Sequence, residues 1–154
     1  MAENRAGAAF VEPMLLLRTE KLPEGKDWLY ELKFDGYRAL AIKSGGTVRL
    51  RSRNDNDFSA RYPGIVAALA GLPDDTVIDG EVVALDAAGK PSFNMLQNYG
   101  SAAAPLHSFV LDLLGLNGKD VMGEPWCNGA RCWRSAYYRN CQSRSVIRLD
   151  SRRA

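Results

Sequence analysis

Histidine, cysteine and long apolar runs are all scarce in this sequence, and each scarcity excludes a class of protein. There are one histidine and three cysteines, and the spacing of Cys127, Cys132 and Cys141 fits no zinc site. Disulfide bonds are not expected in a cytosolic chain. No apolar run approaches the roughly 20 residues that cross a bilayer, and the first ten residues do not resemble a secretory signal. We therefore expect a cytoplasmic protein with no membrane association and no metal site built from protein side chains.

Acidic residues are almost absent from residues 127–154, which hold seven arginines, no lysine and one acid, Asp150. Residues 1–126 contain 13 basic and 17 acidic side chains, so the net charge of +2 hides two parts of opposite sign. An arginine-rich tail is typical of a segment that binds nucleic acid. The alternative, which we favour, is that residues 126–154 are an atypical tail read from a shifted frame.

The rest of the chain has the composition of a globular protein, with 46% hydrophobic and 25% charged residues, and its length suits one domain. Breakers such as Pro13 indicate a loose opening segment, and we expect residues 1–12 to be flexible. Alternation of apolar and polar residues, Val/Ile-rich stretches and a continuous apolar run between turn signals predict strands, and apolar spacing after Pro63 and Ser92 predicts short helices. The predicted strands cover residues 28–33, 37–43, 47–52, 76–85 and 108–114, and the predicted helices cover 64–72 and 93–98. Tight turns between the strands indicate an α+β fold built on antiparallel sheets.

The sharpest motif is a lysine followed by a turn and an arginine. Lys33 ends the first predicted strand, Asp35-Gly36 forms a hairpin-type turn, and Arg38 lies on the next strand. A lysine amine is a poor nucleophile at neutral pH because its ordinary pKa is about 10.4. A nearby arginine or a bound metal ion can lower that pKa and free the amine. The plain alternative is a surface lysine in a hairpin.

Three further segments place polar residues beside or inside predicted strands. Arg53, in a Ser-Arg-Asn sequence, can donate to a phosphodiester backbone or lie in an ordinary polar loop. Asp79 and Glu81 interrupt a Val/Ile strand, where burial is costly unless they bind a ribose hydroxyl or a hydrated metal ion; otherwise both face solvent. The apolar run over 109–114 is broken only by Asp112 and also fits an ordinary core strand.

In this order and at this spacing, the four segments resemble successive motifs of the ATP-dependent DNA ligases, and most closely the ligase domain of the bacterial end-joining ligase D group. The resemblance covers roughly residues 13–125 and rests on WLYELKFDGYRAL (28–40), SRN (52–54), DGEVVALD (79–86), PSF (91–93) and the strand around Asp112. It implies a partial ATP-grasp-like nucleotidyltransferase domain, with ATP and Mg²⁺ as cofactors and nicked or broken double-stranded DNA as partner. Such enzymes form a lysyl-AMP intermediate, pass AMP to a 5′-phosphate and then seal the strand in DNA repair and recombination. An RNA ligase or capping enzyme, which also nucleotidylates a lysine, fits these motifs less well.

The resemblance also implies a role for each matching side chain. Lys33 corresponds to the lysine that becomes adenylated, and Glu31 to a residue at the edge of the adenine. Arg38 corresponds to the arginine that binds the nucleotide and orients the nick phosphate. Arg53 corresponds to the one that contacts the AMP phosphate or the 5′-phosphate of the nick. Glu81 corresponds to the glutamate on the ribose hydroxyls.

One position departs from the family pattern. The aromatic residue that stacks on adenine ordinarily stands just before the aspartate that corresponds to Asp112, but this chain has Leu111 there. Phe109, two residues earlier and so on the same strand face, is the candidate to replace it, with weaker stacking.

The resemblance ends before the remaining motifs of the family. A Glu-Gly motif that helps bind metal and a Lys-x-Lys strand that holds the α-phosphate should follow Asp112, but Glu124 and Lys119 stand in no such context. We therefore expect a truncated domain with little or no sealing activity by itself; the alternative is a non-catalytic remnant that binds nucleotide or DNA weakly. Codons for residues 131–135, offset by two bases, can read Leu-Leu-Glu-Lys, which supports the shifted frame. The hypothesis fails if the other frames of the locus encode no Lys-x-Lys motif.

Overall fold

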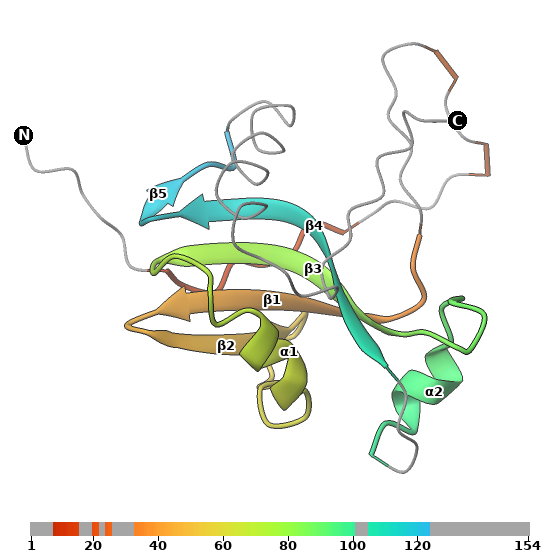
Figure 1. Cartoon of the computed structure of the whole chain (residues 1–154). Helices are drawn as coiled ribbons and strands as arrows, with labels where there is room; N and C mark the ends of the chain where they lie inside the picture. The colour runs from red at the N-terminus through yellow and green to blue at the C-terminus, as the bar shows by residue number, and fades with distance from the viewer. Residues whose placement is uncertain (1–7, 16–19, 22–23, 26–32, 101–104, 124–154) are drawn as a thin grey trace, which may run out of the picture.

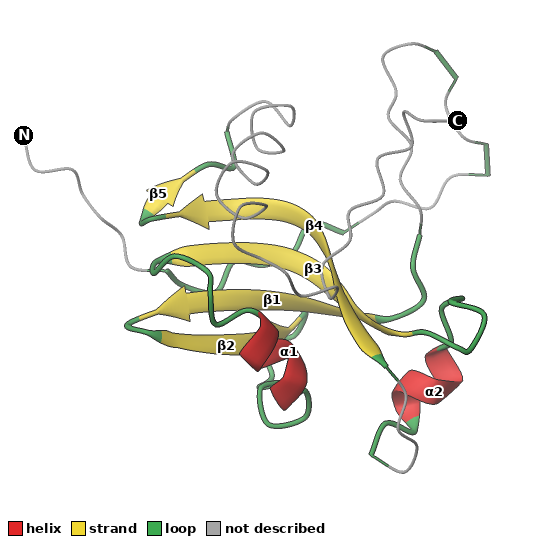
Figure 2. Cartoon of the chain, in the orientation of Figure 1, coloured by secondary structure: helices red, strands yellow, loops and turns green. Residues whose placement is uncertain are grey.

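The computed structural model describes residues 8–15, 20–21, 24–25, 33–100 and 105–123 of the chain. Its centre is an antiparallel sheet of five strands in the spatial order β2-β1-β3-β4-β5 (Figure 1). The strands are β1 (Tyr37–Ser44), β2 (Thr47–Ser52), β3 (Thr76–Ala84), β4 (Leu106–Leu116) and β5 (Lys119–Asp120), and the helices are α1 (Pro63–Ala68) and α2 (Phe93–Gln97). Figure 2 shows the two helices on the connections between strands. The predicted α+β class with an antiparallel sheet is confirmed.

The strands form close to where the sequence predicts them. The ends of β1, β2, β3 and β4 lie within two residues of the predicted ranges. Gly45 and Gly46 form the predicted turn between β1 and β2, with φ values of 56° and 76°. Positive φ at both central residues suits a two-residue hairpin turn, so glycine is needed here for its backbone conformation.

One predicted strand lies almost wholly outside the described residues, and another pairs irregularly with its neighbour. The strand predicted over 28–33 lies outside the described residues, apart from Lys33, which belongs to no strand. The strand predicted over 76–85 is confirmed, because β3 continues through Asp79 and Glu81, which interrupt only its apolar pattern. Its pairing with β4 shifts at two points, between Val77 and Ile78 and between Asp79 and Gly80. A bulge of this kind absorbs an extra residue without ending the strand.

Successive residues of β1 point to opposite faces of the sheet, and each face has its own core. The larger core combines strand residues with Ile65 of α1 and Leu96 of α2. Its strand residues include Ala39, Ala41, Val48, Leu50, Ile78 and Val82. The smaller core, on the opposite face, consists of Leu40, Ile42 and Val77. The helices therefore cover one face of the sheet, and other parts of the chain pack on the opposite face.

A segment that the sequence predicted to be flexible covers the smaller core. Ala8, Phe10 and Val11 pack against it, and the Ala8 amide donates a 3.5 Å hydrogen bond to Oδ1 of Asp75. Residues 8–11 thus pack on the sheet, and the flexibility of residues 1–12 stays a prediction. Phe10 and Val11 cover an apolar row of the sheet, and each Å² of apolar surface removed from water contributes roughly 25 cal/mol.

Helix α1 begins at Pro63 as predicted, where the missing proline N–H is harmless because the first turn has no intrahelical acceptor for it. It ends at Ala68, four residues earlier than predicted. The fully buried side chain of Leu69 turns the chain toward the core. The Ala70 carbonyl then accepts a 3.2 Å hydrogen bond from the buried amine of Lys43. Turns in which the amides of Ala70 and Leu72 bond three residues back replace the last predicted turn of this helix.

Helix α2 confirms the predicted cap. The Oγ atom of Ser92 accepts a 3.5 Å hydrogen bond from the Met95 amide, which satisfies one of the free N–H groups of the first turn. Within the described part of the chain, no helix has the length and apolar content needed to cross a bilayer.

Candidate functional site

Three of the predicted site residues form one row across the sheet. Arg38 of β1 pairs with Glu81 of β3, and Glu81 pairs with Phe109 of β4. Residues opposite each other on paired strands have their Cβ atoms about 4.5–5.5 Å apart and on the same face. This is the face opposite the helices, because Arg38 alternates with Ala39, which belongs to the larger core. The sheet register therefore gathers side chains from three segments that are distant in sequence.

Arg38 is held by a residue that the predicted site did not include. Its Nε atom donates a 2.6 Å hydrogen bond to Oδ1 of Asp79, and its Nη2 atom contacts Oδ2 of the same carboxylate. Asp79 is only 3% exposed, so the solvent-facing alternative is wrong for this residue. The hydrogen bond to Asp79 raises the pKa of Arg38 above its already high value. A carboxylate two residues before Glu81 on the same strand face was the signal that could have indicated this partner.

Glu81 ties the loop before β1 to the sheet. Its Oε1 atom accepts a 2.9 Å hydrogen bond from the Gly36 amide. Burial raises the pKa of the Glu81 carboxyl above its ordinary value, while the Gly36 amide and the positive charges of Lys33 and Arg38 lower that pKa in part. The charge of Lys33 therefore acts on the carboxylate that the resemblance assigns to the ribose.

The two Asp-Gly pairs of the motifs need glycine for space. A Cβ added at Gly36 would lie 2.3 Å from the carbonyl oxygen of Val82, and one added at Gly80 would lie 2.5 Å from that of Phe109. Both positions are too close for any side chain that has a Cβ atom. The described part of the chain shows Gly36 as a bend that leads into β1, and the first half of the predicted hairpin lies outside it. Close approach between backbones is thus what these glycines provide.

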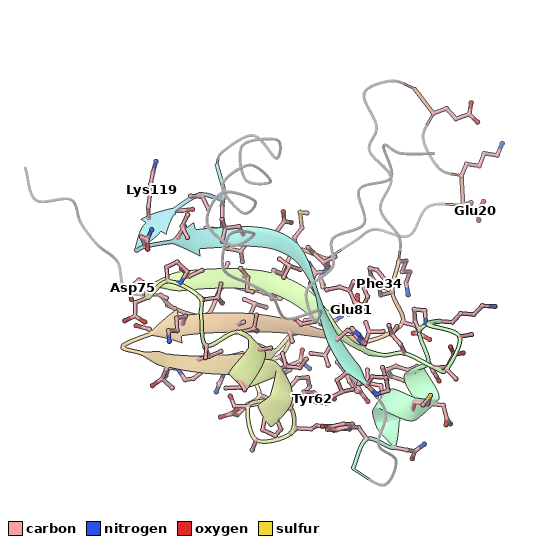
Figure 3. All side chains as sticks on the ribbon, in the orientation of Figure 1. Glu20, Phe34, Tyr62, Asp75, Glu81 and Lys119 are labelled. Atoms are coloured by element: carbon pink, nitrogen blue, oxygen red, sulfur yellow. The ribbon has the colours of Figure 1, made fainter. Side chains whose placement is uncertain are left out.

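Phe109 is stacked on a ring that sequence reasoning missed. The Phe34 and Phe109 ring centroids are 4.0 Å apart with an interplanar angle of 19°. Phe109 is 5% exposed, so Phe34 covers one face of the ring that was assigned to adenine. Leu111 is one of two β4 residues, with Leu114, that the β3–β4 register passes over. Figure 3 shows Phe34 and Glu81 at one end of the sheet, away from Lys119 at the other end.

The remaining predicted residues lie around this row. Lys33 is exposed and directly precedes Phe34. Arg53 is also exposed and follows Ser52, which pairs with Ala39, so it lies at the Arg38 end of the sheet. Glu31 lies outside the described residues. Among the residues that the structure describes, no group of three or more acidic, histidine or cysteine side chains could hold a metal ion.

Comparison with known proteins relates this arrangement to one family. The family described as ATP dependent DNA ligase domain matches residues 13–137. The multifunctional non-homologous end joining DNA repair protein LigD of Mycobacterium tuberculosis is 42% identical over 101 residues, which are 65% of this chain and 13% of that protein. DNA ligase C1 of Mycolicibacterium smegmatis is 35% identical over 131 residues, which are 75% of this chain and 38% of that protein.

Two solved structures have the same fold. A mycobacterial DNA ligase D complexed with ATP and MES is 35% identical with a TM-score of 0.65, and the alignment covers 79% of this chain and 39% of that one. The ligase domain of LigD from M. tuberculosis is 37% identical with a TM-score of 0.64, and the alignment covers 77% of this chain and 38% of that one. This chain thus spans a small part of LigD and less than half of each solved ligase chain. It belongs to the ATP-dependent DNA ligase domain family and represents part of that domain.

Proposed function

We propose that this chain carries the nucleotide-binding part of a DNA ligase domain and that Lys33 accepts AMP from ATP. The observation that supports the proposal most directly is the row of Arg38, Glu81 and Phe109, onto which the Gly36–Glu81 hydrogen bond ties the segment that bears Lys33. A nucleophile, a cation, a carboxylate and an aromatic ring are thereby brought to one end of one sheet face.

The proposed first step is a nucleotidyl transfer. The Lys33 amine, once it has lost a proton to solvent, attacks the α-phosphorus of ATP. A P–N bond forms, the bond between the α-phosphorus and the bridging oxygen breaks, and pyrophosphate leaves with the electron pair of that bond. The nitrogen then loses its second proton to solvent or to the departing pyrophosphate, which leaves the lysyl-AMP phosphoramide. Arg38 and Arg53 supply positive charge and hydrogen-bond donors for phosphate oxygens, which carry the charge that grows in the transition state.

The other residues of the site hold the nucleoside. The Glu81 carboxylate can accept hydrogen bonds from the ribose hydroxyls through its oxygen that is not bonded to Gly36. We assign the adenine to Phe109 and Glu31 as in the family pattern, and binding at Phe109 must accommodate the ring of Phe34. Mg²⁺ would arrive with ATP, since this ion is commonly bound through substrate phosphates and one or two carboxylates. It would neutralise charge on the phosphates.

The later steps need DNA. In the ligase reaction, the 5′-phosphate at a nick attacks lysyl-AMP, and the 3′-hydroxyl then displaces AMP and joins the strand. We propose nicked or broken double-stranded DNA as the substrate of the complete protein, in repair and recombination. A cytoplasmic location stays a prediction, which would give the domain access to ATP.

A second candidate function is weak binding of nucleotide or DNA without transfer. The observation that favours it is the engagement of the Arg38 fork with Asp79, which leaves fewer of its donors for a phosphate. Covalent labelling separates the two candidates, because only transfer leaves AMP on the protein after denaturation.

The test is incubation of the purified chain with ATP labelled at the α-phosphate and Mg²⁺, followed by a denaturing gel. We expect label on the wild type, no label on Lys33→Ala, and wild-type label on Lys90→Ala, which removes another exposed lysine. A folded wild type that binds ATP in equilibrium dialysis but takes up no label would favour the second function. Label on Lys33→Ala would exclude Lys33 as the acceptor.

A further inference from the structure

We propose that Phe34 is a positioning residue, whose stack on Phe109 aims Lys33 at the nucleotide. The inference rests on the proposed function of Lys33 as the AMP acceptor. It adds a residue that the motif comparison left without a role, since Phe34 lies between the lysine and the Asp-Gly pair.

Among the described residues, the stack and one hydrogen bond hold the segment before β1. Residues 33–35 belong to no strand or helix, and Lys33 and Asp35 are both exposed, whereas Phe34 is half-buried. The Phe34 ring lies on Phe109 with centroids 4.0 Å apart, and the amide of Gly36 donates to Glu81. The segment is therefore held at its second and fourth residues, and the side chains between and beside them project outward.

Of these two contacts, the Phe34–Phe109 stack restricts Lys33 more, because it is nearer to Lys33 along the chain. Consecutive Cα atoms are 3.80 Å apart across a trans peptide, so the Lys33 backbone lies one residue from the stacked ring. Without the stack, the next fixed point toward β1 among the described residues is the Gly36 amide, three residues away. Lys33 is then held less closely on its β1 side, so its amine samples a larger volume, and a nucleophile displaced by about 1 Å can react roughly 100-fold more slowly.

An alternative role for Phe34 is to occupy the place of the base on Phe109. Removal of the ring would then open the site and strengthen ATP binding. The burial of Phe109, which is 5% exposed, favours positioning, because the two rings form a packed pair rather than an open platform with a loose cover. Measurements on variants without the Phe34 ring can separate the two roles. Positioning predicts unchanged ATP affinity with a lower transfer rate, whereas occupation of the base site predicts tighter ATP binding.

The experiment compares Phe34→Ala, Phe34→Leu and Phe34→Tyr with the wild type. Tyr99→Ala is the matched control, because Tyr99 is a half-buried aromatic residue that packs on Tyr62 in the larger core. Three quantities are measured on each folded variant: equilibrium binding of ATP, the single-turnover rate of label transfer at saturating ATP, and hydrogen exchange of the Gly36 amide by NMR without ATP.

We expect ATP binding by Phe34→Ala to stay within about twofold of the wild type, while the transfer rate falls roughly 10- to 100-fold. The Gly36 amide should exchange faster with solvent, because the stack no longer holds residues 33–35 beside it. Phe34→Tyr should restore both values, since a tyrosine ring can stack in the same way. Phe34→Leu, which keeps apolar volume without a ring, should resemble Phe34→Ala and serves in its place if the alanine variant does not fold.

Three results would overturn the inference. Transfer at the wild-type rate in Phe34→Ala and Phe34→Leu would show that the stack does not aim Lys33. Tighter ATP binding in these variants would assign Phe34 to the place of the base. If the wild type takes up no label, the proposed function fails by itself, and the amide exchange still decides whether the stack orders the segment: an unchanged rate for Gly36 rejects the positioning role.

Discussion

Replacing Asp79 with asparagine should reveal how much the Arg38–Asp79 pair contributes to the folded state. The side chain of Asp79 is 4% exposed and that of Arg38 is 24% exposed. Removing one partner of a buried ion pair costs about 3–5 kcal/mol, because the other charge stays buried without compensation. Arg38 keeps some contact with water, and asparagine keeps one acceptor oxygen, so we expect a loss of about 2–3 kcal/mol in the free energy of unfolding.

Urea denaturation of Asp79→Asn, Arg38→Gln and the double variant measures this contribution. The double variant should be more stable than the sum of the two single losses predicts, since the two residues contact each other. In a thermal melt, the loss should lower Tm by about 5–10 °C, given about 2–4 °C per kcal/mol for a chain of this size.

Asp55→Asn is the matched control. Asp55 accepts a 2.7 Å hydrogen bond from Nε of Arg51, but 49% of its side chain is exposed. Its φ of 59° is a conformation that asparagine adopts readily. Exposed ion pairs contribute little, so we expect no measurable change. The reasoning is refuted if Asp79→Asn costs no more than Asp55→Asn.

Two further substitutions test the loop that precedes β1. Gly36→Ala should lower the free energy of unfolding by about 1–3 kcal/mol, because its Cβ would lie 2.3 Å from the Val82 carbonyl oxygen. Gly71→Ala is the control, since a Cβ at Gly71 meets nothing within 4 Å. Equal urea denaturation curves for the two variants would contradict the close approach at Gly36. Glu81→Gln should weaken ATP binding measured by equilibrium dialysis but make unfolding less dependent on pH. Since burial raises the pKa of Glu81 above 4.5, the folded wild type holds this proton more tightly than the unfolded chain, so its stability falls as pH rises from 4.5 through the raised pKa. Glu81→Gln should lack that fall, and an unchanged pH profile would contradict the burial argument.

Local chemistry was enough to place most elements of the fold. Apolar patterning between turn signals predicted four strands of the sheet, Ser92 predicted the start of α2, and Gly45-Gly46 predicted the turn between β1 and β2. Each of these signals acts over a few residues, through side-chain direction, a cap or a backbone conformation. The end of α1 was misplaced because the chain turns at Leu69, whose side chain is fully buried, and the amides of Ala70 and Leu72 then bond three residues back instead of four.

The sequence by itself determined the family, the order of the motifs and the residues that the motifs assign to the nucleotide, because these depend on residue type and spacing. Only the tertiary structure decided how those residues are held. Arg38 meets Asp79 across 41 positions of sequence, and the Gly36 amide meets Glu81 across 45. The stack of Phe34 on Phe109 and the backbone approach at Gly36 likewise join separate segments. Such contacts depend on strand register, which is set by the packing of a whole sheet face and not by any short stretch of the chain.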